Sequence, residues 1–410
     1  MKVLLVHNYY GFTGGEDIYF DNLVKVLEAN GIKVILYSKD FKKLKNRFQK
    51  FKVFLNFFYS IQTVKEINSI LKNEKPDVAH INNIYPIISP SIYSILIKNN
   101  IPIIQTAHNY RLFCSNGICL KNGKTCISCL KNSFRNIFNI CRKDKKLYDF
   151  LLGINIFIVR ILFLKYFKKI ITLSNFQSQI LIKSGIDKKR IALIRNLDLN
   201  NYLKFDDSLK NNNKLKYFNN DTNNNINNNI HSNIINKEYF LYIGRLSEEK
   251  GIKKLVDFFI SEPEKKLAIC GIGPLLNEIK LNIEKHKASN VALLGYKNKK
   301  DLIEIMKKAY AVIIPSICFE VLPLTIFESL KLGIPVIVND IGSLTELVND
   351  GDNGFKYKDF TTLKQILDNF LVMPYYELKK ISENCKNYYY KFLNPQNSLT
   401  NLLNLYNEFL

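Results

Sequence analysis

The first half of the sequence is short of acidic residues. Residues 1–236 hold 36 of the 59 Lys and Arg but only 15 of the 36 Asp and Glu, which is +21 of the formal charge of +23. Residues 237–410 are nearly balanced, with 23 basic and 21 acidic side chains. This excess indicates an anionic partner for the first half, such as a membrane surface, lipid phosphate or nucleic acid. A compositional bias towards Lys and Asn would explain part of the charge but not its uneven placement.

Signals for export and for membrane spanning are also missing. The chain begins with a strand-like run at 3–6 and shows no charged n-region, apolar h-region and cleavage site, so we expect a cytoplasmic location. The apolar run at 151–164 is short for a spanning helix and is interrupted by Arg160. We expect this run to form a core helix or a membrane-surface helix.

Eight cysteines in a cytosolic chain indicate thiols or a metal site rather than disulfides. Cys126 and Cys129 have the spacing of a zinc knuckle, and Cys114 with Cys141 could complete a four-cysteine site. The outer spacings fit no standard zinc finger, and Cys119 is surplus. Free thiols therefore remain the alternative to structural zinc.

Residues 41–60 combine an apolar stripe with strong positive charge. Apolar side chains recur there at helical spacing, and six Lys or Arg but no acid lie in the same window. The pattern predicts a basic amphipathic helix, whose stripe is formed by Phe41, Leu44, Phe48, Phe51, Leu55 and Phe58. Such a helix serves either as a membrane-surface element or as a packing helix of the domain core.

The length of the chain allows two domains, each with its own core. Residues 211–236 contain 13 Asn in 26 positions, a low-complexity composition with little to bury. We therefore predict a first domain at 1–204, a disordered insertion or linker at 205–236, and a second domain at 237–410.

The stretch 311–344 of the second domain predicts a β-loop-α-β unit. A short apolar strand at 311–315 is followed by a loop, by a helix from Leu324 that Gly333 ends, and by a second strand. Glu320 then lies at the carboxyl end of a strand and Glu328 about one turn inside the helix. Ligands of open α/β sheets bind at this edge. Carboxylates suit sugar or ribose hydroxyls, and the free N–H groups of the helix start suit a diphosphate, so the pattern favours a nucleotide sugar.

Several segments together resemble one enzyme family. The residues that flank Glu320 and Glu328, with 342–355 downstream, resemble the donor half of the retaining GT-B glycosyltransferases of family 4. The segment 242–251 resembles the family's diphosphate-binding segment. The resemblance covers nearly the whole chain except the insertion. It implies an α/β fold of GT-B architecture, in which two Rossmann-like domains with parallel sheets face each other across a cleft. It also suggests that the last helix, 399–410, crosses back towards the first domain.

The resemblance implies a retaining transfer of sugar from a nucleotide diphosphate-sugar. Arg245 and Lys250 would neutralise the leaving diphosphate, in place of a metal ion. Glu320 would bind the sugar hydroxyls and Glu328 the ribose, while the backbone at Leu324 would face the diphosphate. The only small molecule implied is the nucleotide sugar itself as co-substrate, with no cofactor.

The first domain would bind the acceptor. The loop with Gly14 and Gly15 is similar to the family's Gly-Gly loop, which lies near the donor phosphates, so we assign Gly15 to donor binding. His108 follows a predicted strand and is similar to a family histidine placed near the transferred sugar. It is therefore our second candidate catalytic residue, beside Glu320.

The acceptor is expected to be a glycan or a lipid-linked sugar, such as a polyprenyl-diphosphate glycan or lipopolysaccharide core. The basic first half and its apolar segments lead us to expect contact with an anionic membrane, on its inner face. Two alternatives stay open. One is a nucleotide-sugar epimerase of the same fold. The other is a non-catalytic nucleic-acid-binding protein, although the sequence shows no RNP-like motif or basic helix-turn-helix, so we expect no nucleic-acid partner.

Overall fold

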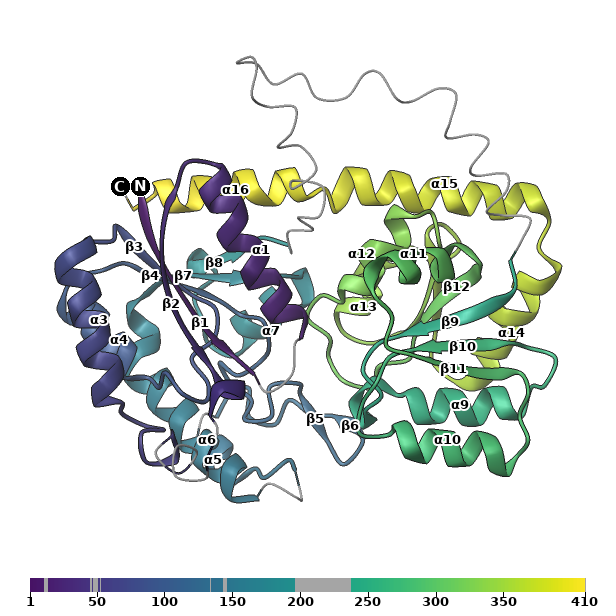
Figure 1. Cartoon of the computed structure of the whole chain (residues 1–410), viewed down its shortest axis with the longest axis horizontal. Helices are drawn as coiled ribbons and strands as arrows, with labels where there is room; N and C mark the ends of the chain where they lie inside the picture. Colours follow the sequence, from purple (N-terminus) through teal and green to yellow (C-terminus); the bar gives the residue numbers. More distant parts are fainter. Residues whose placement is uncertain are drawn as a thin grey trace, which may run out of the picture. The chain divides into compact units, whose positions relative to one another are not determined.

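The computed structural model describes residues 1–409 except 11–13, 45, 47–50, 52, 133, 143–145 and 196–236. These residues form two compact units (Figure 1). The first unit contains the strands up to β8, except β6, together with the C-terminal helix α16, and the second contains β6 and the elements from β9 to α15. The predicted boundary at 204 and the predicted insertion at 205–236 lie outside the described residues, so both stay predictions.

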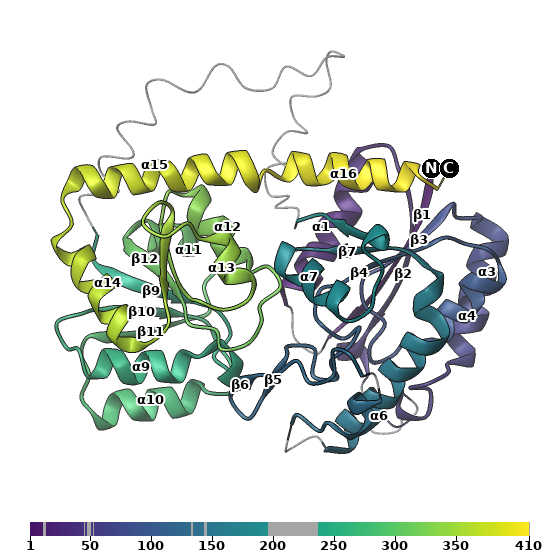
Figure 2. The same cartoon turned by 180° about the vertical axis from the view of Figure 1, so that it is seen from behind.

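The first unit is built on a parallel sheet of six strands in the order β2-β1-β3-β4-β7-β8. Its central strands are runs of buried Val, Ile and Leu, as expected for parallel strands covered on both faces. Helix α1 covers one face, while α3 and α4 cover the other (Figures 1 and 2). The strands are β1 (Lys2–Tyr9), β2 (Lys33–Asp40), β3 (Val78–Ile81), β4 (Ile103–Thr106), β7 (Phe167–Thr172) and β8 (Ile191–Leu193).

Two helices of the first unit begin at serine caps. Ser60 accepts a hydrogen bond from Thr63 N at the start of α3, and Ser174 accepts one from Gln177 N at the start of α7. Helix α16 belongs to this unit because the hydroxyl of Tyr406 lies 2.5 Å from Nδ1 of the buried His80. The helices are α1 (Gly15–Ala29), α3 (Ile61–Glu74), α4 (Ser91–Lys98), α5 (Arg135–Phe138), α6 (Lys146–Ile158), α7 (Asn175–Lys183) and α16 (Pro395–Asn407). A short hairpin joins β5 (Leu120–Lys121) to β6 (Lys124–Thr125).

The prediction of one amphipathic helix over 41–60 is wrong for the described part of that segment. Phe41–Lys43 is a single 3-10 turn, which Asp40 caps through Lys42 N, and Leu44 has an extended backbone. Helical residues resume at 51 and 53–55, and the chain then turns before α3. The i, i+3 spacing was therefore not one face of one helix. The extended backbone of Leu44 ends the first turn, and Ser60 begins a separate helix, α3.

The second unit contains a parallel sheet of six strands in the order β11-β10-β9-β12-β13-β14. In chain order this is 3-2-1-4-5-6, the order typical of dinucleotide-binding sheets. Helices α9 and α10 cover one face, and α11, α12 and α13 cover the other (Figures 1 and 2). The strands are β9 (Tyr239–Ile243), β10 (Leu267–Cys270), β11 (Val291–Gly295), β12 (Ala309–Ile314), β13 (Val336–Asn339) and β14 (Gly354–Tyr357).

The helices of the second unit are α9 (Ile252–Ile260), α10 (Leu276–Lys285), α11 (Lys299–Lys307), α12 (Leu324–Lys331), α13 (Ser343–Leu347), α14 (Phe360–Val372) and α15 (Tyr375–Phe392). The predicted strand, loop and helix around Glu320 are confirmed: α12 ends before Gly333, whose φ of 75° is the left-handed value a C-terminal glycine supplies. The fold is thus α/β with two parallel, Rossmann-like sheets, as predicted.

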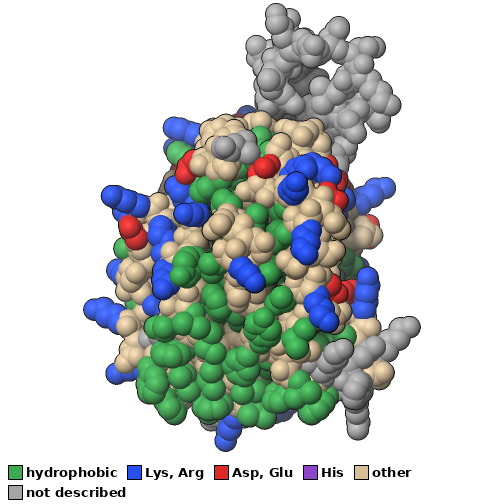
Figure 3. Space-filling view, turned by 90° about the vertical axis from the view of Figure 1, so that its left-hand side faces the viewer, with side chains coloured by type: hydrophobic (Ala, Val, Ile, Leu, Met, Phe, Trp, Pro, Cys, Tyr) green, Lys and Arg blue, Asp and Glu red, His purple; other side chains and the backbone are tan. Residues whose placement is uncertain are grey.

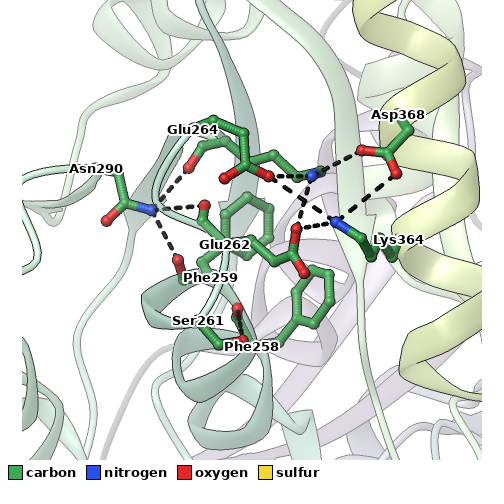
Figure 4. A network of polar contacts seen from close by, with 9 residues as sticks. Phe258, Phe259, Ser261, Glu262, Glu264, Asn290, Lys364 and Asp368 are labelled. Carbon is green, nitrogen blue, oxygen red and sulfur yellow. Dashed lines mark hydrogen bonds and ion pairs between the residues drawn. The ribbon is translucent and has the colours of Figure 1, made fainter.

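A polar network ties the α9–β10 connection to α14 (Figure 4). The side chain of Lys265 is only 1% exposed, and its ammonium contacts the carboxylates of Glu262, Glu264 and Asp368 at 2.5–2.8 Å. The amide of Asn290 donates to three backbone carbonyls of the same connection, those of Phe259, Glu262 and Lys265. This network holds the connection before β10 against α14, away from the loops that follow β9 and β12 in the chain.

Candidate active site

The second sheet reverses its strand order between β9 and β12, and the loops after these two strands pack together. Such a reversal is where open α/β sheets bind ligands. Gly251, with a φ of 70°, ends the 3-10 turn Glu248–Lys250, and a Cβ there would lie 2.0 Å from the carbonyl oxygen of Pro315. The backbone N–H of Ile317 also donates to the carbonyl of Glu249 at 3.0 Å. Only glycine permits this close approach.

Lys250 and Glu320 meet at this point. Nζ of Lys250 lies 2.6 Å from Oε1 of Glu320, and the hydroxyl of Ser316 donates to the same oxygen at 2.6 Å. The hydroxyl of Ser343 donates to the backbone carbonyl of Glu320, which fixes the loop as well as the side chain. Burial would lower the pKa of Lys250, but the Glu320 carboxylate outweighs it, so the pKa is raised and the ammonium stays charged.

Arg245 lies in the loop directly after β9. Its guanidinium pairs with the carboxylate of Glu249, and its Nε donates to the hydroxyl of Ser247 at 3.2 Å. Its side chain is 42% exposed, so part of the donor fork faces solvent. The ion pair with Glu249 holds the guanidinium on the same short segment as Lys250, where it can receive a phosphate.

The loop after β10 packs against the backbone of the loop that carries Arg245. A Cβ at Gly271 would lie 1.9 Å from the carbonyl oxygen of Gly244, and a Cβ at Gly273 would lie 2.4 Å from that of Leu246. The two glycines therefore have a packing role. They bring two loops into backbone contact, which the sequence alone showed only as an isolated G-x-G.

Helix α12 contains the remaining two residues that were predicted to bind the donor, Leu324 and Glu328. Leu324 is its first residue, and the N-cap Pro323 contributes no side-chain hydrogen bond, which leaves the amino end of the helix to its backbone N–H groups. Glu328 lies one turn further on, with a side chain 32% exposed and 3.9 Å from Nζ of Lys299. The structure thus brings Lys250 and Glu320 into contact, whereas Arg245 and Glu328 have their own ion-pair partners nearby.

The first unit has its own polar edge, where β1, β3 and β4 end. Gly15 is the first residue of α1 and is exposed, and a Cβ at the neighbouring Gly14 would meet nothing within 4 Å. Asp17 accepts from Gly14 N at 3.0 Å and from the buried His7 at 2.9 Å. The described chain itself leaves open space beside this helix start.

His108 follows β4 at the same edge. Its Nε2 lies 2.8 Å from Oδ1 of Asn82, and its ring packs edge-on to Tyr19 with centroids 4.8 Å apart. Burial, reinforced by His7 and His80, holds the pKa of His108 well below its usual value. The ring is therefore neutral near pH 7. Since an amide oxygen only accepts, Nε2 carries the proton and Nδ1 keeps its lone pair.

Comparison with known proteins identifies the chain. Residues 225–391 match the family model for glycosyl transferases group 1, and residues 13–197 match the model for glycosyltransferase family 4. The chain belongs to the GT-B glycosyltransferases of group 1, family 4.

Two relatives of this glycosyltransferase match most of its sequence or part of it. An uncharacterised glycosyltransferase of Methanocaldococcus jannaschii is 25% identical over 361 residues, 86% of this chain and 83% of the relative. An Escherichia coli enzyme named as an α-1,3-galactosyltransferase that uses UDP-galactose and GlcNAc-diphosphoundecaprenol is 30% identical over 128 residues, 29% of this chain and 32% of that enzyme. Two solved structures share its fold. A Rickettsia africae glycosyltransferase is 19% identical with a TM-score of 0.67, over 100% of this chain and 98% of that one. Anabaena HepE with UDP and glucose is 15% identical with a TM-score of 0.65, over 99% of both chains.

The sequence reasoning missed two charged residues of this glycosyltransferase. Glu16 follows Gly15, and burial raises its pKa to about 8, although Arg111 lowers it in part. Arg111 contacts the hydroxyl of Tyr10 and lies near the rings of Tyr10 and Tyr85. Oε1 of Glu16 and Nε of Arg111 are buried, and no hydrogen-bond partner for either atom is found among the residues that the structure describes. The signal was present in the sequence, because Arg111 lies three residues after His108 and Glu16 directly after the glycine pair.

The cysteines of the glycosyltransferase are all free thiols. Within the described part of the chain, no group of three or more His, Cys, Asp or Glu is arranged to hold a metal ion. A hydrogen bond from the Cys119 thiol, with further backbone donors, lowers the pKa of Cys114 to about 7. The suggestion of a four-cysteine zinc site therefore gains no support from the described residues.

Proposed function

We propose that the enzyme transfers a sugar, with retention of configuration, from a nucleotide diphosphate-sugar to a glycan or lipid-linked acceptor in surface polysaccharide or lipopolysaccharide synthesis. The contact of Lys250 with Glu320 at the strand-order reversal of the second sheet supports this most strongly. It joins a phosphate-binding cation to a hydroxyl-binding carboxylate at the position where such sheets bind nucleotides. Family membership favours transfer over epimerisation or a non-catalytic role.

In the donor half, Arg245 and Lys250 bind the diphosphate and stabilise the charge that grows on it as the bond to the sugar breaks. The backbone N–H groups at Leu324 add the positive end of a helix dipole. Glu320 accepts from sugar hydroxyls and Glu328 from the ribose. The two cations perform the neutralising role that a divalent metal performs in other transferases, so the proposal includes neither a metal nor another cofactor.

In the acceptor half, the acceptor hydroxyl attacks the anomeric carbon on the face from which the diphosphate departs. The bond to the leaving phosphate breaks as the new bond forms, and the phosphate oxygen takes the hydroxyl proton. Neutral His108 orients a hydroxyl through Nδ1, and Gly15 gives the donor phosphates room beside α1. Arg111 and Glu16 offer a cation and a protonated carboxyl to the acceptor, which suits a sugar carried on a phosphate.

The acceptor is proposed to be membrane-linked and the enzyme to work in the cytoplasm, on the inner face of the membrane. The E. coli galactosyltransferase is named for a diphosphoundecaprenol acceptor, and HepE has been crystallised with UDP and glucose. These names concern the relatives. They support a nucleotide sugar and a lipid-linked acceptor as the first compounds to test here.

A thermal-stabilisation screen of nucleotide sugars tests the proposal. A ligand at 100 times its Kd stabilises the native state by about 2.7 kcal/mol, enough for a shift of a few degrees. We expect one nucleotide to raise the melting temperature of the wild type and of Lys253→Ala, whose ion pair with Glu278 is exposed. The shift should vanish in Lys250→Ala. A failure of every nucleotide sugar to stabilise the wild type would contradict the proposal.

A further inference from the structure

The first unit exposes a group of large apolar side chains on one side. Ten of them are between 46% and 66% exposed, and they come from three segments: Phe51, Phe54, Leu55, Tyr59, Ile61, Phe134, Phe138, Leu147, Ile161 and Leu162. Figure 3 shows hydrophobic side chains covering the lower part of this side of the molecule, with Lys and Arg around them. Figure 1 places α5 and α6 at the bottom of the unit. Apolar patches of this kind mark interaction surfaces.

The three segments pack against one another, and we call their surface the docking face: 51 with 53–61, 134–140 and 146–166. Phe57 packs on Tyr148 with centroids 6.0 Å apart, and its carbonyl accepts from the amide of Asn155 at 2.9 Å. Phe134 packs on Phe157 at 6.0 Å. A Cβ at Gly153 would lie 2.2 Å from the carbonyl of Asn136, so α5 lies directly on α6. The apolar face is therefore held in place by the unit's own core.

The charges around the docking face have one sign. Among the described residues of its three segments the single acid is Asp149, which is buried and paired with Arg142. Exposed basic side chains lie within or beside the same segments: Lys131, Arg135, Lys146, Lys165 and Lys168. An apolar centre with a basic rim matches an anionic lipid bilayer.

The helical segment Lys146–Tyr166 is long and apolar enough to cross a membrane, by length and composition. The structure anchors it to the unit instead. Asn155 also accepts from the buried hydroxyl of Tyr85 at 2.8 Å, and Arg160 donates to the carbonyls of Leu112 and Ser184 at 3.3 and 2.6 Å. Extracting the helix into a bilayer would leave these polar groups unpaired, which is costly. The helix therefore presents one side to the surroundings and keeps the other in the core.

We propose that the first unit docks on an anionic membrane surface as a monotopic protein, inserting the apolar side chains of the docking face into one leaflet. The proposal rests on the proposed function, because it supplies the surface through which the enzyme reaches a lipid-linked acceptor. The positive charge around the docking face favours an anionic bilayer over a second copy of the chain as its partner. A twofold dimer through this face would bring its basic rim against an identical basic rim, whereas anionic lipid neutralises the rim.

Vesicle flotation with the full-length protein tests the docking face. The wild type should float with vesicles of 30% phosphatidylglycerol in phosphatidylcholine and bind pure phosphatidylcholine much less. The triple variant Leu55→Asp/Phe138→Asp/Leu162→Asp should reduce the partition coefficient roughly tenfold or more. The matched control Leu281→Asp/Tyr296→Asp/Val372→Asp changes residues of the second unit that are 65–80% exposed and should bind as the wild type does. Alkaline carbonate should release bound protein.

Several results would overturn the docking proposal. The first is a wild type that does not float with either kind of vesicle at low salt. The second is a triple variant that binds vesicles as well as the wild type does. The third is a bound protein that resists carbonate extraction, which would indicate a membrane-spanning helix. A wild-type dimer that the patch variant dissociates, without vesicle binding, would assign the face to self-association. The nucleotide screen separates the two proposals. Nucleotide binding without flotation would contradict only the docking proposal, whereas flotation without nucleotide binding would contradict only the proposed function.

Discussion

The ammonium of Lys250 lies 2.6 Å from Oε1 of Glu320, although 70 residues separate the two in the chain. The contact exists because Lys250 ends the loop after β9 and Glu320 lies in the loop after β12, the neighbouring strand across which the order of the sheet reverses. A bound diphosphate would compete with Glu320 for the ammonium and free the carboxylate for a sugar hydroxyl.

Removing either partner should therefore impair transfer strongly. We expect Lys250→Ala and Glu320→Gln each to lower kcat/KM by about 10²–10³-fold, because each removes a group that acts on developing charge or on the transferred sugar. Steady-state kinetics with the donor found in the nucleotide screen measures this. Lys253→Ala should stay within twofold of wild type. Near-wild-type rates for Glu320→Gln would exclude a role for its carboxylate.

Arg111 should act on the acceptor. Arg111→Lys keeps the charge but loses the planar fork, so we expect KM for a phosphate-linked acceptor to rise roughly tenfold while KM for the donor changes little. Arg190→Lys is the matched control, because Arg190 is a second partly buried arginine of the first unit and donates to the backbone carbonyls of Phe167 and Leu164. An equal rise in both KM values would place Arg111 elsewhere in the mechanism.

His80 makes the first unit sensitive to acid. Burial lowers the pKa of His80 to about 3, below its ordinary value of 6.5. The unfolded chain therefore takes up the proton first, and stability is lost as the pH falls from about 6.5 towards 3. Between pH 6.5 and 5, His80 alone should lower the unfolding free energy of this unit by about 2 kcal/mol, and the buried His108, whose pKa is also lowered, should add to this fall.

Chemical denaturation at several pH values tests the histidine prediction. His80→Gln should lower the unfolding free energy near pH 7, but its fall between pH 6.5 and 5 should be about 2 kcal/mol smaller than in the wild type. His286→Gln, at the exposed end of α10, should leave the pH dependence of the unfolding free energy unchanged. An unchanged slope in His80→Gln would show that other groups carry the acid sensitivity.

Lys265 should matter for stability and not for chemistry. Lys265→Ala leaves Glu262, Glu264 and Asp368 without their shared buried ammonium, and we expect a loss of about 2–3 kcal/mol. Lys280→Ala, whose pair with Glu284 is exposed on both sides, should cost less than about 0.5 kcal/mol. Nucleotide binding at saturating ligand should be retained in both variants. Its loss would mean that the network also supports the site.

The sequence was sufficient to predict the fold and the strand, loop and helix around Glu320, for identifiable reasons. Buried apolar runs separated by Gly and Pro mark parallel strands, and the pattern around Glu320 fixes a strand, a loop and a helix start within 30 residues. It could not show that Glu249 holds Arg245 or that Gly271 and Gly273 serve packing, because those contacts depend on which loops become neighbours. The docking face depends in the same way on three segments that only the fold brings together.

The amphipathic prediction for 41–60 failed for a different reason. Apolar spacing predicts one helix only if the backbone stays helical throughout, and here the turn that Asp40 begins ends at Leu44, whose backbone is extended. Glu16 and Arg111 were visible in the sequence. Only the folded structure shows that both side chains are buried and that no described residue bonds Oε1 of Glu16 or Nε of Arg111.

The most direct test of the central claim is the configuration of the product. The purified enzyme should be incubated with the nucleotide sugar that stabilises it and a short-chain lipid-diphosphate sugar acceptor, and the new linkage followed by NMR. The account predicts a glycoside with the same anomeric configuration as the donor, formed by the wild type and nearly absent with Lys250→Ala. An inverted glycoside, or conversion of the donor without any acceptor, would contradict it.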